Sequence, residues 1–381
     1  MTIKIKNFSA SCVAAMLLLS ACSAPMSIAA PIANAKECAP LVRNIDTALA
    51  ANIDAVIDDA LGRGFAGGVA ILQNDIVVYS RTVGSASLSE NIPVTDETLF
   101  HVASITKYFT AALVLRAVEE GLIALDDPIA KYAPDMKLSA RGVTIEALLL
   151  HRSGLGSSYV AEQESDRDAA LAAIDNAPFD PEKMGRYNYS NDGYDVLGIL
   201  LERIYGRDYE DLLREKILTR ACLERPRHWS LVDLSNPTVI SQPLAPFPPE
   251  LINRNYGMVA SAGLLITAED LAAYQWALAN GKVLSAQSIK ALFTPRAKRK
   301  SDYATFGGFW REHDVLGPRL SARGYEDWGD NAIMNHYLDK DVIVVVVTSR
   351  GPADDTGARP FRSELSAAIE ILLSDAASNE E

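Results

Sequence analysis

Two pairs of apolar runs, one near each end of the chain, constrain the fold most strongly. Residues 68–73 ("GVAILQ") and 76–82 ("IVVYSRT") are joined by Asn74 and Asp75, and residues 332–348 repeat the pattern with "AIMNHYL" and "VIVVVVT". Short apolar runs separated by Asn or Asp turn residues are typical of β-hairpins. The sequence therefore predicts an antiparallel sheet built from segments that lie far apart in the chain.

The residues between and around these hairpins have mostly helical periodicity. Expected helices cover residues 41–61, 144–150, 168–174, 193–204, 209–217, 267–279 and 361–373. Antiparallel strands combined with such helices indicate an α/β (α+β) fold, in which helices flank one sheet. We expect a mostly helical second lobe at about residues 120–255, and a small-molecule site in the cleft between the two lobes.

The N-terminus resembles a targeting segment. Lys4 and Lys6 precede the apolar run "CVAAMLLLSAC", which is too short to span a membrane as a mature helix. The stretch "LSAC" resembles a bacterial lipobox, which implies cleavage before Cys22 and lipidation of that residue. Cleavage after Ala35 is the alternative. The expected protein is therefore exported to the periplasm and anchored to a membrane through lipid on Cys22.

These boundaries divide the chain into three parts: residues 1–21 as a signal peptide, 22–40 as a tether and 41–375 as one catalytic domain. An oxidising compartment would allow a disulfide between Cys38 and Cys222, and two unpaired thiols are the alternative.

Charge and composition exclude several kinds of partner. The chain carries a formal net charge of −13, which argues against nucleic acid as a partner. The basic stretch at residues 296–300 ("RAKRK") is interpreted as a solvated loop. The 5 histidines show no zinc-type spacing with each other or with cysteine, so no metal is expected. No Gly-rich phosphate loop stands out, and no cofactor is expected.

The stretch "HVASITKYFT" carries the first chemical motif, in which Lys107 follows Ser104 by three residues. On a helix these side chains lie on nearly the same face, about one turn apart. Burial in an apolar helix disfavours a charged ammonium, so a buried Lys107 could remain neutral and accept the serine proton. The alternative is a surface lysine that extends to water and has no catalytic role.

A second motif, Tyr189-Ser190-Asn191, precedes an expected helix. A phenol can relay a proton, and a carboxamide can orient a substrate or the lysine. An ordinary loop that caps the helix is the alternative explanation.

Together these motifs resemble the serine β-lactamase-related hydrolases, a group that includes class C β-lactamases, D-Ala-D-Ala carboxypeptidases and certain esterases. The segments that carry the resemblance, in chain order, are "LFHVASITKYFTAALVLRAVEEGLIALDDPIAKYAPD", "VTIEALLLHRSGL", "YNYSNDGYDVLG", "SAGLLITAEDLAAY" and "TFGGFW". The resemblance implies a β-lactamase/penicillin-binding-protein-like fold.

The resemblance also implies a role for each motif residue. Ser104 would be the nucleophile, Lys107 its general base and Tyr189 the proton carrier to the leaving group, with Asn191 in support. The backbone N–H of Ser104 would form half of the oxyanion hole. By the same resemblance, His101 and His151 are structural residues.

The third family motif, Lys-Thr-Gly or His-x-Gly, does not occur at the expected place. The best candidate is Trp328-Gly329-Asp330, with Asn331 as the second oxyanion donor, and a buried structural Trp328 is the alternative. That candidate contains no cation to hold a substrate carboxylate.

The sequence thus predicts an exported serine hydrolase that forms an acyl-enzyme on Ser104. The absent cation favours carboxylic esters or small amides over substrates that carry a carboxylate. One alternative is a D-Ala-D-Ala carboxypeptidase or weak β-lactamase acting on a peptide or β-lactam. The other is a penicillin-recognising binding protein that does not hydrolyse its ligand.

Overall fold

The structure, a computed structural model, describes residues 41–44, 47–247, 253–351 and 361–379. Residues 1–40, which contain the expected signal peptide, the tether and Cys22, lie outside the described residues. Cys222 is disulfide-bonded, and its expected partner Cys38 also lies outside them. None of the helices in the described part of the chain is both long enough and apolar enough to cross a membrane.

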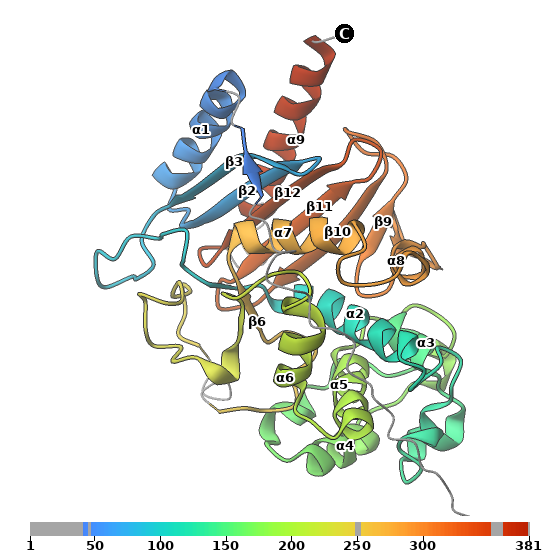
Figure 1. Ribbon diagram of the computed structural model, residues 1–381. Helices are drawn as coiled ribbons and strands as arrows, with labels where there is room; N and C mark the ends of the chain where they lie inside the picture. Colours follow the sequence, from blue (N-terminus) through green and yellow to red (C-terminus); the bar gives the residue numbers. More distant parts are fainter. Residues whose placement is uncertain (1–40, 45–46, 248–252, 352–360, 380–381) are drawn as a thin grey trace, which may run out of the picture.

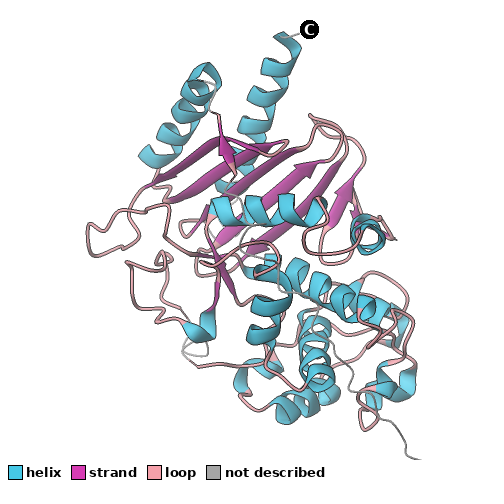
Figure 2. Cartoon of the chain, viewed as in Figure 1, coloured by secondary structure: helices cyan, strands magenta, loops and turns pink. Residues whose placement is uncertain are grey.

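A nine-stranded sheet forms the upper layer of the molecule (Figures 1 and 2). The strands, in spatial order, are β1 Val42–Arg43, β3 Ile76–Val83, β2 Gly67–Gln73, β12 Val342–Thr348, β11 Asn331–Tyr337, β10 Arg319–Tyr325, β9 Phe309–Arg311, β8 Tyr303–Ala304 and β7 Ala297–Lys298. Strand β2 pairs antiparallel with both β3 and β12, so strands that are more than 260 residues apart in the chain lie side by side within the sheet. Both predicted hairpins are confirmed.

Helices cover both faces of this sheet. They are α1 Thr47–Gly62 and α9 Phe361–Asn379 on one face and α7 Ala268–Ala279 on the other, and α8 Ala286–Phe293 packs against α2 (Thr106–Glu119) of the lobe described below. Alternate residues of a strand point to opposite faces, and β12 is buried on both. Val344 and Val346 pack in the core under α1 and α9, whereas Val345 and Val347 belong to the core on the α7 side. The continuous valine run is therefore the signature of a central strand covered by helices on both sides.

A mostly helical lobe lies below the sheet (Figure 1). Its helices are α2 Thr106–Glu119, α3 Ile145–Leu149, α4 Arg167–Asn176, α5 Asn191–Tyr205 and α6 Tyr209–Leu213. Each predicted helix in this region is present, with ends that differ by a few residues. A small sheet of β4 Phe100–His101, β6 Leu264–Ile266 and β5 Arg227–His228 joins the lobe to the rest.

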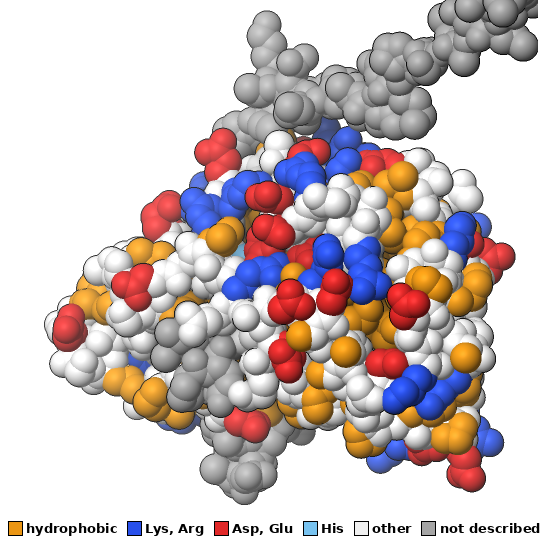
Figure 3. Space-filling model, turned by 90° about the horizontal axis from the view of Figure 1, so that it is seen from below, with side chains coloured by type: hydrophobic (Ala, Val, Ile, Leu, Met, Phe, Trp, Pro, Cys, Tyr) orange, Lys and Arg blue, Asp and Glu red, His pale blue; other side chains and the backbone are white. Residues whose placement is uncertain are grey.

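The face seen from below carries mixed charge (Figure 3). Lysine and arginine side chains lie next to aspartate and glutamate side chains there, with hydrophobic side chains scattered among them. This face is therefore not uniformly basic.

Strand β10 passes very close to the segment that precedes α2. A Cβ atom added at Gly324 would lie 1.9 Å from the Val102 carbonyl oxygen and 3.0 Å from the Ala103 Cβ. Only glycine permits this approach, because the obstructing atom belongs to the backbone and cannot rotate away.

We therefore predict that Gly324→Ala lowers the free energy of unfolding by about 1–3 kcal/mol, the usual cost of overpacking. Chemical denaturation of the two proteins measures this difference. Gly62→Ala is the matched control, because nothing lies within 4 Å of a Cβ at Gly62. Equal losses in both variants would show that the close approach at Gly324 does not hold the two segments together.

Candidate active site

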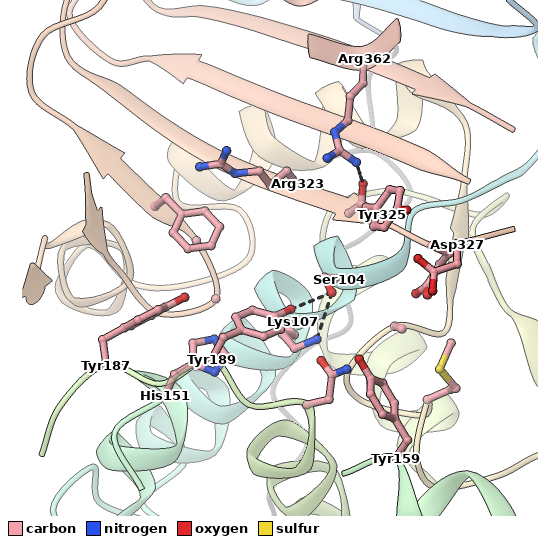
Figure 4. A pocket seen from close by; sticks show the side chains of 18 of the residues that line it. Ser104, Lys107, His151, Tyr159, Tyr187, Tyr189, Arg323, Tyr325, Asp327 and Arg362 are labelled. Carbon is pink, nitrogen blue, oxygen red and sulfur yellow. Dashed lines mark hydrogen bonds between the residues drawn. The ribbon is translucent and has the colours of Figure 1, made fainter. Parts of the chain in front are cut away.

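A cavity of about 720 Å³ opens where the sheet meets the helical lobe, and Ser104 lines it (Figure 4). Ser104 belongs to a short 3-10 helix, Ala103–Ile105, that runs directly into α2. Ala103 has a φ of 47°, a backbone conformation that non-glycine residues rarely adopt. Local strain of this kind persists only where the surrounding structure enforces it.

Buried hydrogen bonds from Thr106 enforce the serine turn. The Thr106 hydroxyl donates to the Ala103 carbonyl at 2.8 Å and accepts from the Leu264 N–H at 3.0 Å. The Val102 N–H also donates to the Leu264 carbonyl at 3.1 Å. Strand β6 therefore fixes the position of the nucleophile segment.

Lys107 is buried on α2, with 2% of its surface exposed. Its Nζ lies 3.2 Å from Ser104 Oγ and donates to the Ser261 carbonyl at 2.8 Å. Burial lowers the pKa of Lys107 to about 8, against a smaller opposing effect of the Asp195 carboxyl. At neutral to mildly alkaline pH a substantial fraction of the amine is therefore neutral and able to accept a proton.

Asp195 lies beneath Lys107 on α5 and is also buried. Burial raises the pKa of Asp195 well above its usual range, and a hydrogen bond with Ser261 opposes this only in part. Burial therefore disfavours the charged form of both side chains.

Tyr189 completes the group around the nucleophile. Its hydroxyl donates to Ser104 Oγ at 2.7 Å, and Lys107 Nζ lies 5.1 Å from the centre of its ring. Burial raises the pKa of Tyr189, so the phenol keeps its proton at neutral pH. Ser104 Oγ therefore contacts a potential base and a potential acid at the same time.

His151 holds the Tyr189 loop from behind. Its Nδ1 accepts the Ser190 N–H at 3.0 Å, and its ring lies 4.5 Å from the Tyr189 ring. Burial lowers the pKa of His151 to about 3, so the ring is neutral and can accept this bond. His151 thus acts as a positioning residue.

Asn191 is the first residue of α5 and lines the cavity. Its N–H donates to Ser157 Oγ at 2.9 Å. Its side-chain oxygen is buried and accepts no hydrogen bond from the described residues. Buried acceptors are usually paired, so this oxygen is suited to receive a donor from a ligand.

Most of the residues that were predicted to form the third motif do not line the cavity. Trp328 lines the cavity, but Gly329, Asp330 and Asn331 do not. Asn331 is fully buried at the start of β11, between Tyr325 of β10 and Thr348 of β12. Its backbone is enclosed within the sheet, and it therefore does not lie where a second oxyanion donor is needed.

Asp330 instead contacts His101 beneath the cavity. Its Oδ2 accepts a hydrogen bond from Trp328 Nε1 at 2.8 Å and lies 3.5 Å from His101 Nδ1. Burial alone would lower the pKa of His101, but this carboxylate more than compensates and raises it. The pair fixes Trp328 from below and is separate from Ser104.

The end of β10 takes the place at the cavity that the motif was expected to fill. Arg323, Gly324 and Tyr325 all line it, and Gly324 brings β10 against the nucleophile segment. The predicted motif itself contains no cation, but Arg323 brings one to the cavity. Arg323 lies five residues before the expected tryptophan, in a strand whose register only the folded sheet defines.

Other lining residues had no motif to reveal them. Arg299 lies in the stretch that was interpreted as a solvated loop, yet it lines the cavity. Glu162, Glu326 and Asp327 also line it. Burial raises the pKa of Glu326 to about 7, with the charges of His101 and Lys107 opposing the shift.

Known proteins show the same fold. A D-amino acid amidase from Ochrobactrum anthropi superposes with a TM-score of 0.74 at 20% identity, over 87% of this chain and all of that one (100%). FmtA from Staphylococcus aureus gives 0.73 at 21% identity, over 89% of this chain and 93% of that one. A penicillin binding protein from Bacillus halodurans gives 0.69 at 22% identity, over 84% and 99%.

Sequence comparison gives a relative with higher identity over a shorter stretch. The teichoic acid D-alanine hydrolase of Staphylococcus aureus is 31% identical over 153 residues, which are 40% of this chain and 38% of that protein. The match thus spans well under half of the relative's length. The family described as Beta-lactamase matches residues 53–368, which is most of the chain. The chain therefore belongs to the Beta-lactamase family and has the fold of its serine hydrolases.

Proposed function

We propose that this protein hydrolyses carboxylic esters or small amides through an acyl-enzyme on Ser104. One observation carries the proposal: Ser104 Oγ lies 3.2 Å from the buried amine of Lys107 and 2.7 Å from the protonated phenol of Tyr189. A nucleophile that contacts both a base and an acid is the arrangement that acyl transfer requires.

The first half-reaction forms the acyl-enzyme. Ser104 Oγ attacks the acyl carbon while its proton passes to neutral Lys107. Tyr189 then donates its proton to the departing oxygen or nitrogen, and Lys107 returns a proton to Tyr189. The bond from the acyl carbon to the leaving group breaks, and an ester bond to Ser104 replaces it.

The second half-reaction releases the acyl group. Water attacks the acyl carbon, gives up a proton to the same basic group and displaces Ser104 Oγ, which regains its proton. We assign the oxyanion donors to the backbone of Ser104 and of the β10 end near Gly324, since that glycine brings the two segments together.

The acyl group that we propose is a small aminoacyl group with a free ammonium. Asp327 lines the cavity on the side of Ser104 opposite to Tyr187 (Figure 4), and Glu162 and Glu326 line it too. Carboxylates stabilise a nearby ammonium. Two similar proteins are named for activities on this class, a teichoic acid D-alanine hydrolase and a D-amino acid amidase, and they support the same acyl group.

The direct test is turnover of neutral p-nitrophenyl acetate and of a D-alanyl ester by the wild type, Ser104→Ala and Lys107→Arg. We expect both variants to lose at least about 10³-fold in kcat/KM, because arginine keeps its charge and cannot act as a neutral base. Circular dichroism checks that each variant is folded. Stable labelling by a fluorescent penicillin without any turnover would instead indicate a binding protein.

The pH profile provides a second prediction. The pKa of Lys107 is lowered to about 8, so the neutral base is lost as the pH falls below that value. We expect kcat/KM for the neutral ester to fall about tenfold per pH unit below 8 and to level off above it. The Glu326→Gln variant should show the same fall of kcat/KM below pH 8. If the fall disappears in that variant, the group that titrates is Glu326 and not Lys107.

We also propose that the protein is exported and anchored through Cys22, on the strength of the apolar run and "LSAC". Expression of the full chain in a Gram-negative host, followed by fractionation, tests this. The wild type should enter the membrane fraction, and Cys22→Ala should not acquire lipid mass. Cleavage after Ala35 in both proteins, read by mass spectrometry, would contradict the anchor.

A further inference from the structure

Two arginines share a single acidic partner at one end of the cavity. Arg323 Nη2 lies 3.2 Å from Asp302 Oδ2, and Arg299 Nη1 lies 3.3 Å from the other oxygen of the same carboxylate. One negative charge thus faces two positive ones. This end of the cavity carries an excess positive charge that a bound anion would balance.

Aromatic rings hold both guanidinium groups in place. The Phe309 ring centre lies 4.2 Å from Arg299 Cζ and 4.9 Å from Arg323 Cζ, and Tyr187 lies 4.9 Å from Arg299. Stacking of this kind occupies the faces of a guanidinium and leaves its N–H edges for a ligand. Arg299 Nη1 is buried and forms no hydrogen bond with the described residues, despite its proximity to Asp302.

The electrostatic surroundings agree with an anion site. Burial lowers the pKa of Arg323; the positive charge of Arg299 lowers it further, while Asp302 raises it. Like charges held this close together repel each other in a partly buried site. An anion between the two arginines would relieve this repulsion and replace lost hydration.

The arginines lie on the leaving-group side of Ser104. Figure 4 shows Tyr187, Tyr189 and Arg323 on one side of Ser104, and Tyr159 and Asp327 on the other. In the proposed mechanism Tyr189 passes its proton to the departing atom, so the leaving group must lie on the Tyr189 side. The acyl group then lies toward the carboxylates.

A second hollow, of about 470 Å³, adjoins the cavity through Arg299, which lines both. Three further cations line it, namely Lys298, Lys300 and Arg311, and its acidic residues are Asp302 and Glu312. The positive charge at the end of the cavity therefore continues outward along the surface. A single small carboxylate would reach only its first part.

We propose that the leaving group is an alcohol that carries phosphate, with its first phosphate bound between Arg299 and Arg323. In a longer substrate, further phosphates lie along the hollow lined by Lys298, Lys300 and Arg311. This inference rests on the proposed function and extends it from the acyl group to the departing alcohol. The substrate class is an aminoacyl ester of a phosphate-containing polyol.

The test compares D-alanyl esters that differ only in the alcohol: glycerol, glyceric acid, glycerol 1-phosphate and a glycerol phosphate dimer. We expect kcat/KM for the glycerol 1-phosphate ester to exceed that for the glycerol ester by about tenfold or more at low salt, because one hydrogen bond between charged groups contributes a factor of this size. The dimer should be hydrolysed faster still, and added salt should reduce both preferences.

Substitutions locate the effect. Arg299→Gln and Arg323→Gln should each reduce the ratio of kcat/KM for the phosphate ester to that for the glycerol ester, and Arg299→Lys should restore part of it. The double variant Lys298→Gln, Lys300→Gln should reduce only the ratio of dimer to monomer. Arg207→Gln, at an exposed arginine outside the cavity, is the matched control for net charge. Thermal unfolding checks that every variant is folded.

Three outcomes would overturn the proposal. Equal kcat/KM for the glycerol and glycerol 1-phosphate esters would contradict the anion site. Turnover of p-nitrophenyl acetate in the same experiment would still support the proposed function. A glycerate ester hydrolysed as well as the phosphate ester would indicate a single-carboxylate site instead. Failure to hydrolyse any of the esters would contradict both the proposed function and this inference.

Discussion

The chemistry of the site depends on burial of one amine. Lys107 is enclosed by apolar neighbours on α2 and by the lobe below it, and the Asp195 and Glu326 carboxyls favour its charged form less than burial disfavours it. Loss of hydration is what lowers its pKa. The nine-stranded sheet and the helical lobe meet around this amine, and Ser104 lies at their junction with access to the cavity.

The elements that the sequence predicted well are those encoded by neighbouring residues. The two hairpins follow from apolar runs and their turn residues, and the helices follow from periodicity over one or two turns. Ser104 and Lys107 are three residues apart on one helical segment, so local geometry alone predicts their contact. The approach of Tyr189, 85 residues away from Ser104, followed only from the family resemblance.

The third motif could not be located in this way, because it depends on contacts between distant segments. Which residue of β10 reaches Ser104 is decided by pairing with β11 and by the bare backbone of Gly324. Arg299 is a similar case: in sequence it belongs to a basic stretch typical of a solvated loop. Only the packing of Phe309 and Tyr187 brings it to Arg323, and that changes the expected charge of the cavity.

The hydrogen bond from Lys107 Nζ to the Ser261 carbonyl oxygen also fixes the direction from which the amine can accept a proton. A neutral amine has two N–H bonds and one lone pair, and a fixed acceptor at 2.8 Å orients one of those bonds. The rotation left to the amine is then small, so its lone pair stays within reach of the serine hydroxyl. Because this acceptor is a main-chain oxygen, no side-chain replacement at position 261 can delete it.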